Sequence, residues 1–366
     1  MTTPFPLLRL PYLVLMPVLE QMERKERIAL LILSKRARMF LKLLKMKCEY
    51  INLTLNYGTV EMEVFLDNME ELKLELYTSG YVEFRYGQNV ILCNTMGVPP
   101  MNYVVSIMDV LHCKSIDFFK IAEISPCNIL PLLVNLPKIN RVVVHSDLSA
   151  VSLVDSRLLK VLRMVLPVSS AVSIPYFLLL KYHREILQGN FDELRVGNLV
   201  EGGLPNRKMK FSLNDLRMTN AKTLEILYVI LNSKDMNRYF KMWMKKKCNP
   251  RLEYLRVEQK DSFNNDLLLK GLNAVPVPIE TKREFRVLGK VQQLRSSDDE
   301  ISFEFDITRA DGKKATIISN GDNSIHFYVW PESTNDTKNI EPNQSSFTRV
   351  FSQVSTFYNS FIEGFK

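Results

Sequence analysis

With 366 residues, 46% of them hydrophobic, the chain is long enough for two or three folded domains and too apolar to be intrinsically disordered. The formal net charge is +8, but residues 1–50 hold ten Lys/Arg and four Asp/Glu, so the remaining 316 residues are nearly neutral. A main domain without concentrated positive charge argues against nucleic-acid binding. The five cysteines form no CxxC pair, so we expect a protein of a reducing compartment, the cytoplasm or nucleus. No apolar run approaches the roughly 18 residues of a membrane-spanning helix, so we expect the protein to be soluble.

Residues 5–40 predict three short helices. Pro is well tolerated in a first helical turn, and from Leu10-Pro11 onward apolar residues recur with helical spacing, at Leu10, Leu13, Val14, Pro17, Val18 and Met22. A charged step leads into the apolar run 28–33, and Ser34-Lys35-Arg36 opens the third helix. The first helix is apolar almost all round, so it is expected either to be buried in a large core or to dock on a partner.

The same stretch resembles an F-box, through Leu10-Pro11, Ile28-Ala29-Leu30 and Leu33-Ser34-Lys35-Arg36. The resemblance implies that these helices dock on the Skp-family adaptor of a cullin-based ubiquitin ligase. The residues expected to contact the adaptor are Leu10, Pro11, Val14, Leu15, Val18, Leu19, Met22, Ile28, Leu31, Leu33, Ser34 and Arg36. Such adaptors are acidic, so the basic N-terminus could steer the encounter. The alternative is an ordinary helical hairpin buried against the rest of the chain.

From Cys48 the apolar period changes from helical to two. Alternation of apolar and polar residues predicts half-buried strands over residues 51–55, 60–64, 72–76 and 82–86.

Beyond residue 115 a weak LxxLxL pattern recurs, with copies beginning at Ile139, Phe191, Leu213 and Leu252. In a leucine-rich repeat these apolar positions point into the core of a solenoid, and each predicted strand here is preceded by a possible helix, for instance over residues 127–136 and 236–246. The pattern therefore predicts an irregular α/β solenoid.

A second resemblance covers residues 191–275. It rests on residues 213–221, 237–243 and 249–255, which resemble the F-box-associated region of a large F-box family expanded in nematodes. Within this region Trp243 is interpreted as a core aromatic rather than as part of a partner-binding surface.

The C-terminal part begins at an extended linker around Pro276 and Pro278. Residues 301–307, 315–318 and 325–330 predict a three-stranded antiparallel meander, joined by turns at Asp311-Gly312 and Asn320-Gly321. Residues 347–365 follow a helical period with many aromatic side chains, so we predict an amphipathic helix that packs back on the fold. Its alternative role is a detachable segment that binds a partner groove.

Catalytic motifs are not found in the sequence. The four histidines have no metal-ligand spacing, and no phosphate loop or nucleophile elbow occurs. His112-Cys113 are adjacent and point in different directions, so they are interpreted as structural. We therefore expect a non-catalytic protein without a metal or organic cofactor.

The overall expectation is an α+β multidomain protein. It combines a three-helix F-box (1–47), a leucine-rich-repeat-like region (48–275, including the F-box-associated segment 191–275), and a meander with a C-terminal helix (276–366). The expected function is substrate recognition in an SCF-type ubiquitin ligase, with the Skp-family adaptor, and through it a cullin, and an unknown protein target as partners. The alternative is a leucine-rich-repeat interaction scaffold outside ubiquitin chemistry, whose N-terminal helices cap the solenoid.

Overall fold

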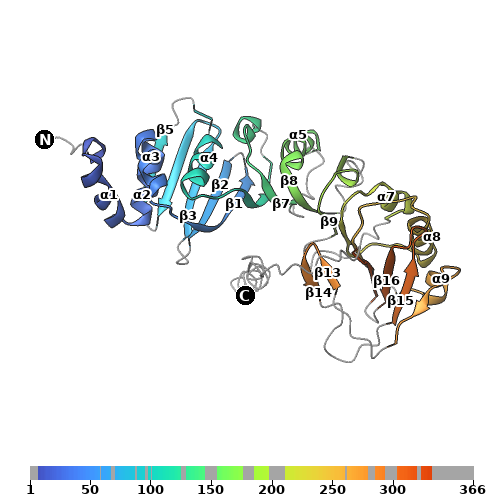
Figure 1. Cartoon of the computed structure of the whole chain (residues 1–366). Helices are drawn as coiled ribbons and strands as arrows, with labels where there is room; N and C mark the ends of the chain where they lie inside the picture. The colour runs from blue at the N-terminus through green and yellow to red at the C-terminus, as the bar shows by residue number, and fades with distance from the viewer. Residues whose placement is uncertain are drawn as a thin grey trace, which may run out of the picture. The chain divides into compact units, whose positions relative to one another are not determined.

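The fold is described from a computed structural model of the chain (Figure 1). The structure describes residues 7–57, 59–66, 71–86, 89–94, 98–99, 101–124, 129–144, 155–175, 185–197, 211–259, 262–278, 285–292, 303–319 and 323–331. The helix predicted over residues 347–365 lies outside these ranges. None of the helices in the described ranges is both long and apolar enough to cross a membrane.

The N-terminus forms a single 3-10 turn and three α-helices, as the sequence predicts. These are η1 (Leu7–Arg9), α1 (Tyr12–Gln21), α2 (Arg24–Leu33) and α3 (Lys35–Leu43). A capping box begins α2, since the Glu23 side chain accepts from the backbone of Glu26 while the Glu26 side chain accepts from the backbone of Glu23. Ser34 begins α3, because its side chain accepts a hydrogen bond from the backbone N–H of Ala37 at 3.3 Å.

A mixed sheet holds fifteen of the strands in the described ranges. Its first part is antiparallel and follows chain order, β1 (Cys48–Asn56), β2 (Thr59–Leu66), β3 (Glu71–Tyr77), β4 (Tyr81–Tyr86) and β5 (Asn89–Asn94). Strands β1 to β4 confirm the predictions made from alternation, and the buried residues in β2 and β3 alternate with half-buried or exposed ones.

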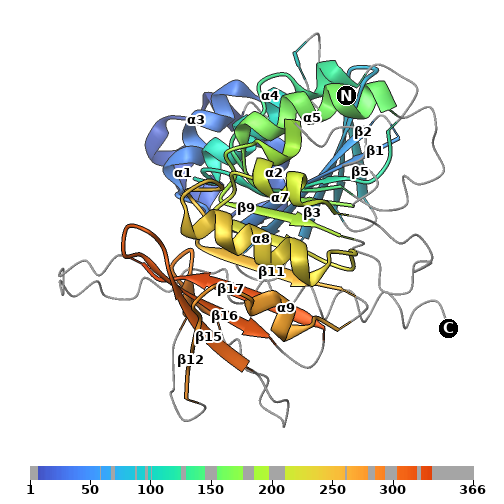
Figure 2. The same ribbon diagram turned by 90° about the vertical axis from the view of Figure 1, so that its right-hand side faces the viewer.

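The central part of the sheet is parallel. Strand β1 pairs with β6, and the following strands add one by one in chain order, β6 (Ile116–Ile121), β7 (Ile139–Val144), β8 (Ser169–Ile174), β9 (Glu193–Val196), β10 (Thr223–Ile226) and β11 (Tyr254–Glu258). Helices lie between these strands in sequence, α4 (Met101–Val110), η2 (Leu130–Leu133), α5 (Asp155–Val165) with η4 (Leu166–Val168), α7 (Leu213–Met218) and α8 (Ser233–Met244). Figure 2 shows α4, α5, α7 and α8 along one face of the sheet.

The apolar positions of the parallel strands form ladders under these helices. In one ladder each strand contributes a side chain at the same register, Phe119, Val142, Val172, Leu194, Leu224 and Leu255, and each is at most 1% exposed. Burying such a side chain stabilises the fold by about 1.5–3 kcal/mol. Neighbouring strands and helices of this part of the chain therefore share one core.

One predicted strand was wrong. Residues 213–218 form helix α7, because Ser212 and Asp215 make a capping box and the Ser212 side chain accepts from the Asp215 backbone N–H at 3.2 Å. The next strand comes later, as β10, where Leu224 and Ile226 take the core positions. The strands predicted at the other three copies of the pattern are confirmed as β7, β9 and β11.

The C-terminal strands continue the same sheet. Strand β11 pairs antiparallel with β17 (Ser324–Val329), which is followed outward by β16 (Lys314–Ser319), β15 (Phe303–Thr308) and the two-residue β12 (Val275–Pro276). Helix α9 (Asn265–Leu269) precedes β12, and a separate hairpin of β13 (Phe285–Val287) and β14 (Lys290–Gln292) was not predicted.

The α+β class is confirmed, with helices at the N-terminus and a large mixed sheet. One hydrophobic core runs from Leu15 in α1 to Val329 in β17 and so includes residues on both sides of the domain boundaries predicted at residues 47 and 275. The sheet also continues across the second of these boundaries. Those boundaries and the assignment of the parallel strands to a leucine-rich repeat stay predictions.

Candidate protein-interaction surface on the N-terminal helices

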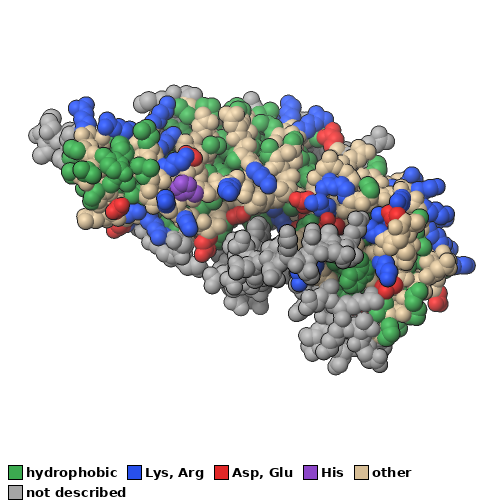
Figure 3. All heavy atoms as spheres, viewed as in Figure 1, with side chains coloured by type: hydrophobic (Ala, Val, Ile, Leu, Met, Phe, Trp, Pro, Cys, Tyr) green, Lys and Arg blue, Asp and Glu red, His purple; other side chains and the backbone are tan. Residues whose placement is uncertain are grey.

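The N-terminal helices expose an unusual amount of apolar surface. Leu13 is 84% exposed, the largest value among the big apolar side chains in the described ranges. Figure 3 shows hydrophobic side chains gathered on the α1 end of the molecule. We define the apolar patch as the exposed large side chains of α1 to α3, namely Tyr12, Leu13, Val14, Leu33, Met39 and Leu43. A soluble protein rarely leaves such side chains together in water unless they bind something.

The opposite side of these helices is fully packed. Leu15 and Leu19 of α1, one helical turn apart, are 0% exposed and belong to the hydrophobic core, as do Ile28 and Leu31 of α2. Helix α1 is therefore apolar on two faces, and only one of them serves the fold of this chain. The second face is available to a partner.

The residues predicted to contact an adaptor divide into three groups. Leu15, Leu19, Ile28 and Leu31 are buried in the chain's own core. Leu10, Val18, Met22 and Ser34 are half-buried. Pro11, Val14, Leu33 and Arg36 are exposed. The first group has a packing role, and Ser34 also caps α3, so direct contact with an adaptor stays a prediction for the residues that keep accessible surface.

Sequence reasoning left Tyr12, Leu13, Met39 and Leu43 out of the predicted contacts. The helical period of α1 shows that apolar residues surround the helix, but it does not show which side the rest of the chain covers. In α3 the signal was present, because Met39 and Leu43 are one turn apart and break its basic face.

An aromatic contact connects the first and third helices. The rings of Tyr12 and Phe40 lie 6.3 Å apart, and the Arg36 guanidinium lies over the Phe40 ring at 6.0 Å. This contact brings positive charge close to the apolar patch. The surface accordingly suits a partner that is apolar at the centre of the contact and acidic at its edge.

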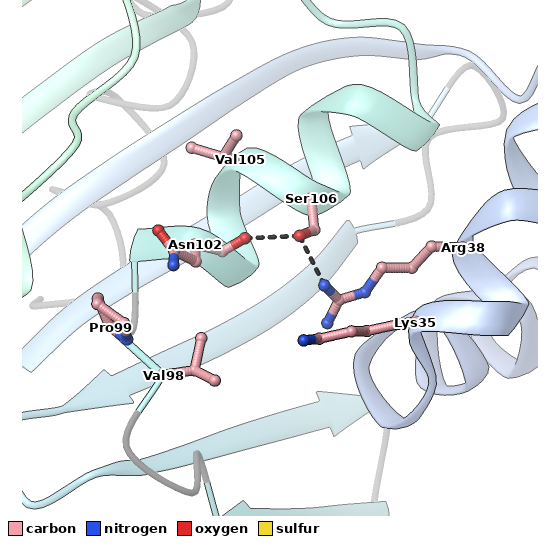
Figure 4. A pocket seen from close by; sticks show the side chains of 7 residues that line it. All are labelled: Lys35, Arg38, Val98, Pro99, Asn102, Val105 and Ser106. Carbon is pink, nitrogen blue, oxygen red and sulfur yellow. Dashed lines mark hydrogen bonds between the residues drawn. The ribbon is translucent and has the colours of Figure 1, made fainter.

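A shallow pocket lies where α3 meets α4 (Figure 4). Its volume is about 480 Å³, and it is lined by Lys35, Arg38, Val98, Pro99, Asn102, Val105 and Ser106. Arg38 donates to the backbone oxygen of Leu31 at 2.8 Å and to Ser106 Oγ at 2.9 Å. Burial lowers the pKa of Arg38, and the nearby Tyr103 partly opposes that shift. With two cationic side chains on one wall, the pocket can accommodate a negatively charged group.

Helix α3 is attached to α4 by a series of polar contacts. We define this α3–α4 seam by Arg38, Lys42, Ser106, Asp109 and His112. Besides the Arg38–Ser106 bond, Lys42 pairs with Asp109 at 2.7 Å, and His112 Nε2 lies 3.2 Å from the backbone oxygen of Lys42. The seam and the shared core hold the N-terminal helices in one orientation relative to the sheet.

The region around Trp243 is a second packed centre. Trp243 is 0% exposed and meets the ring of Phe327 edge-on at 5.1 Å, and the Arg309 guanidinium lies over the Trp243 ring at 5.3 Å. This confirms its interpretation as a core aromatic. Helix α8 is thereby fixed against strand β17.

The sheet face opposite the ladders carries charge in ion pairs between strands. Arg141 of β7 lies 2.5 Å from Glu193 of β9, and Lys73 of β3 lies 3.2 Å from Glu63 of β2. Burial raises the pKa of Glu193 and the charge of Arg141 partly opposes this shift. Within the described part of the chain, no three His, Cys, Asp or Glu side chains are grouped so that they could hold a metal ion.

Comparison with known protein families identifies two domains in this chain. A family model for the F-box domain matches residues 7–49, which cover η1 to α3 and the start of β1. A model described as F-box associated matches residues 182–257, which include β9, α7, β10, α8 and most of β11. No curated protein and no solved structure matches the chain. An F-box domain implies a Skp-family partner, and an F-box associated domain implies a protein target. The chain therefore carries an F-box domain and, downstream of it, an F-box associated domain.

Proposed function

We propose that this chain is the substrate-recognition subunit of an SCF-type ubiquitin ligase. Its F-box binds a Skp-family adaptor and, through it, a cullin, while the region downstream binds a protein target. The observation that carries the proposal is the apolar patch on α1 to α3, which stays exposed although the core beneath it is complete.

The patch supports docking rather than folding. Its side chains contribute little to the chain's own core, because Leu13 is 84% and Met39 68% exposed. Their burial against an adaptor would supply apolar area that the chain alone leaves in water. The basic side chains of Lys35 and Arg36 on α3 favour approach by an acidic partner.

The mechanism is an increase in effective concentration, and it needs no catalytic group in this chain. A target held by the F-box-associated region lies at a fixed position relative to the F-box, because the α3–α4 seam and the continuous core connect the two. Transfer of ubiquitin from a conjugating enzyme bound to the same complex then becomes quasi-intramolecular. Chain rigidity matters here, since a loose connection would lower that effective concentration.

The test is binding of the full-length chain to purified Skp-family adaptor, measured by isothermal calorimetry. The variant Leu13→Glu/Leu33→Glu places two charges in the patch and is expected to abolish binding. The matched control is Val275→Glu, a change at a side chain that is 62% exposed on strand β12, away from the F-box. It is expected to bind like the wild type. Circular dichroism must show all three proteins folded.

Two results would contradict the proposal. One is a wild-type chain that does not bind the adaptor. The other is a Leu13→Glu/Leu33→Glu variant that binds as tightly as the wild type, because the patch would then not be the docking surface.

A second candidate function is an interaction scaffold whose N-terminal helices cap the sheet. The burial of Leu15, Leu19, Ile28 and Leu31 in the common core favours it, since terminal repeats need such a cap. It predicts no adaptor binding. Both functions predict a loss of stability when the buried side of α1 is truncated, so only the binding measurement separates them.

A further inference from the structure

Two cysteines far apart in the sequence meet at the junction between the F-box and the sheet. Cys48 opens β1, and Cys113 follows the end of α4. Their Sγ atoms lie 2.8 Å apart, and both thiols are free and half-buried. A disulfide bond is about 2.05 Å long, so a small side-chain movement would be enough to form one.

The backbone on both sides of this pair is already held in place. Asn52 of β1 is in register with Phe118 of β6 in the parallel part of the sheet, so the two cysteines precede paired positions. The α3–α4 seam lies next to them along the chain, through Lys42, Asp109 and His112. The thiols therefore meet without an ordering step.

Their hydrogen bond makes the two thiols unequal. Either thiol can be the donor of this hydrogen bond; with the Cys48 thiol as the donor, the bond lowers the pKa of Cys113 and raises the pKa of Cys48. The negative charge of the Asp117 carboxylate acts to raise the pKa of both cysteines. Since the thiolate is the reactive form, Cys113 is the sulfur expected to react first.

We propose that Cys48 and Cys113 form an intramolecular disulfide when the protein meets a peroxide. The Cys113 thiolate attacks one peroxide oxygen, so that an S–O bond forms, the O–O bond breaks and hydroxide leaves, giving a sulfenic acid. The Cys48 sulfur then attacks the sulfenic sulfur of Cys113. The S–S bond forms, the S–O bond breaks, and the departing hydroxide takes the Cys48 proton as water. Two thiols are oxidised and one peroxide is reduced to two waters.

This disulfide would join the end of the F-box to the turn after α4. It adds a covalent bond between the first residue of β1 and the connection from α4 to β6, beside the polar contacts of the α3–α4 seam. Cys248, which is also free, provides an internal reference. Cys248 is 8% exposed, and burial raises its pKa to about 11, so it is expected to stay reduced.

The experiment treats the full-length chain with hydrogen peroxide, blocks remaining thiols with N-ethylmaleimide and maps peptides by mass spectrometry. Trypsin leaves Cys113 on the same peptide as Cys93, so a second cleavage after Tyr103 is needed to separate them. The expected product is a peptide pair linked through Cys48 and Cys113, lighter by two hydrogen atoms and released by dithiothreitol. The variants Cys48→Ser and Cys113→Ser should both lack it.

The single variants also test the order of the steps. In Cys48→Ser the sulfenic acid on Cys113 has no resolving thiol and should be trapped by dimedone. In Cys113→Ser, Cys48 should react with N-ethylmaleimide as it does before peroxide. The proposal is overturned if wild-type Cys113 proceeds to sulfinic acid while Cys48 stays alkylatable, if both thiols stay alkylatable in the wild type, or if the links formed join separate chains.

Discussion

Two residues of helix α1, only two positions apart, are expected to have different roles, one in folding and one in docking. Leu15 is 0% exposed and Leu13 is 84% exposed, so their replacement by Ala should have opposite consequences. Leu15→Ala removes three carbon atoms from the core, which costs about 2.4 kcal/mol at roughly 0.8 kcal/mol per methylene, and the cavity raises this into the range of about 3–5 kcal/mol. Leu13→Ala removes carbon atoms that already contact water, so the free energy of unfolding should change by less than about 0.5 kcal/mol.

Adaptor binding should show the reverse pattern. Leu13 sits in the apolar patch, and truncating an interface side chain that becomes buried costs about 1–2 kcal/mol, which corresponds to roughly a 5–30-fold weaker affinity. Leu15 is 0% exposed in this chain, so its side chain has no accessible surface to offer a partner. Its truncation should therefore lower affinity only to the extent that α1 unfolds.

The assay pairs urea unfolding, followed by circular dichroism, with an adaptor titration by calorimetry on the same preparations. Equal loss of stability in both variants would refute the assignment of the two faces of α1. So would a Leu15→Ala variant with wild-type stability, or a Leu13→Ala variant that is unchanged in both measurements.

Three further perturbations test other parts of the structure. Trp243→Ala should cost about 3–5 kcal/mol of unfolding free energy, because the edge-on contact with Phe327 is lost from a fully buried site, and a urea midpoint equal to that of the wild type would contradict this. Ser212→Ala removes the cap of α7 and should cost about 1 kcal/mol in the same assay, whereas no change would mean that the cap adds nothing. Hydrogen bonds from Arg309 and Lys246 hold the pKa of Asp311 well below its usual range. These bonds therefore stabilise the folded state fully at a pH above the ordinary Asp pKa of about 3.9. Their contribution is lost as the pH falls through the lowered pKa of the folded state. Asp311→Asn should therefore lower the thermal midpoint at neutral pH and converge with the wild type in acid, while a difference that is the same at every pH would count against the ion pairs.

Local sequence signals predicted the elements that depend on neighbours in the chain. The alternation in residues 51–86 predicted β1 to β4, because side chains on a strand point to opposite faces whatever the tertiary fold. The helices around Leu10-Pro11 and Ser34 were predicted for a similar reason, since caps and apolar spacing act within one or two turns.

The error at residues 213–218 shows how local signals can compete. An LxxLxL pattern places apolar residues at spacings of three and two, and a short helix tolerates the same spacing. The capping box of Ser212 and Asp215 decided in favour of the helix, and it was legible in the sequence as a Ser followed three residues later by an acidic side chain.

The sequence by itself determined the three N-terminal helices, strands β1 to β4 and the resemblance of the N-terminus to an F-box, because these depend on residues close together in the chain. Only the tertiary structure decided which face of α1 is buried, since that depends on how the rest of the chain packs against the helix. It also decided that Cys48 and Cys113 meet, because the pairing of β1 with β6 brings together segments that no sequence spacing connects. The apolar patch and the cysteine pair are therefore properties of the fold, and the motif that identified the F-box reveals neither of them.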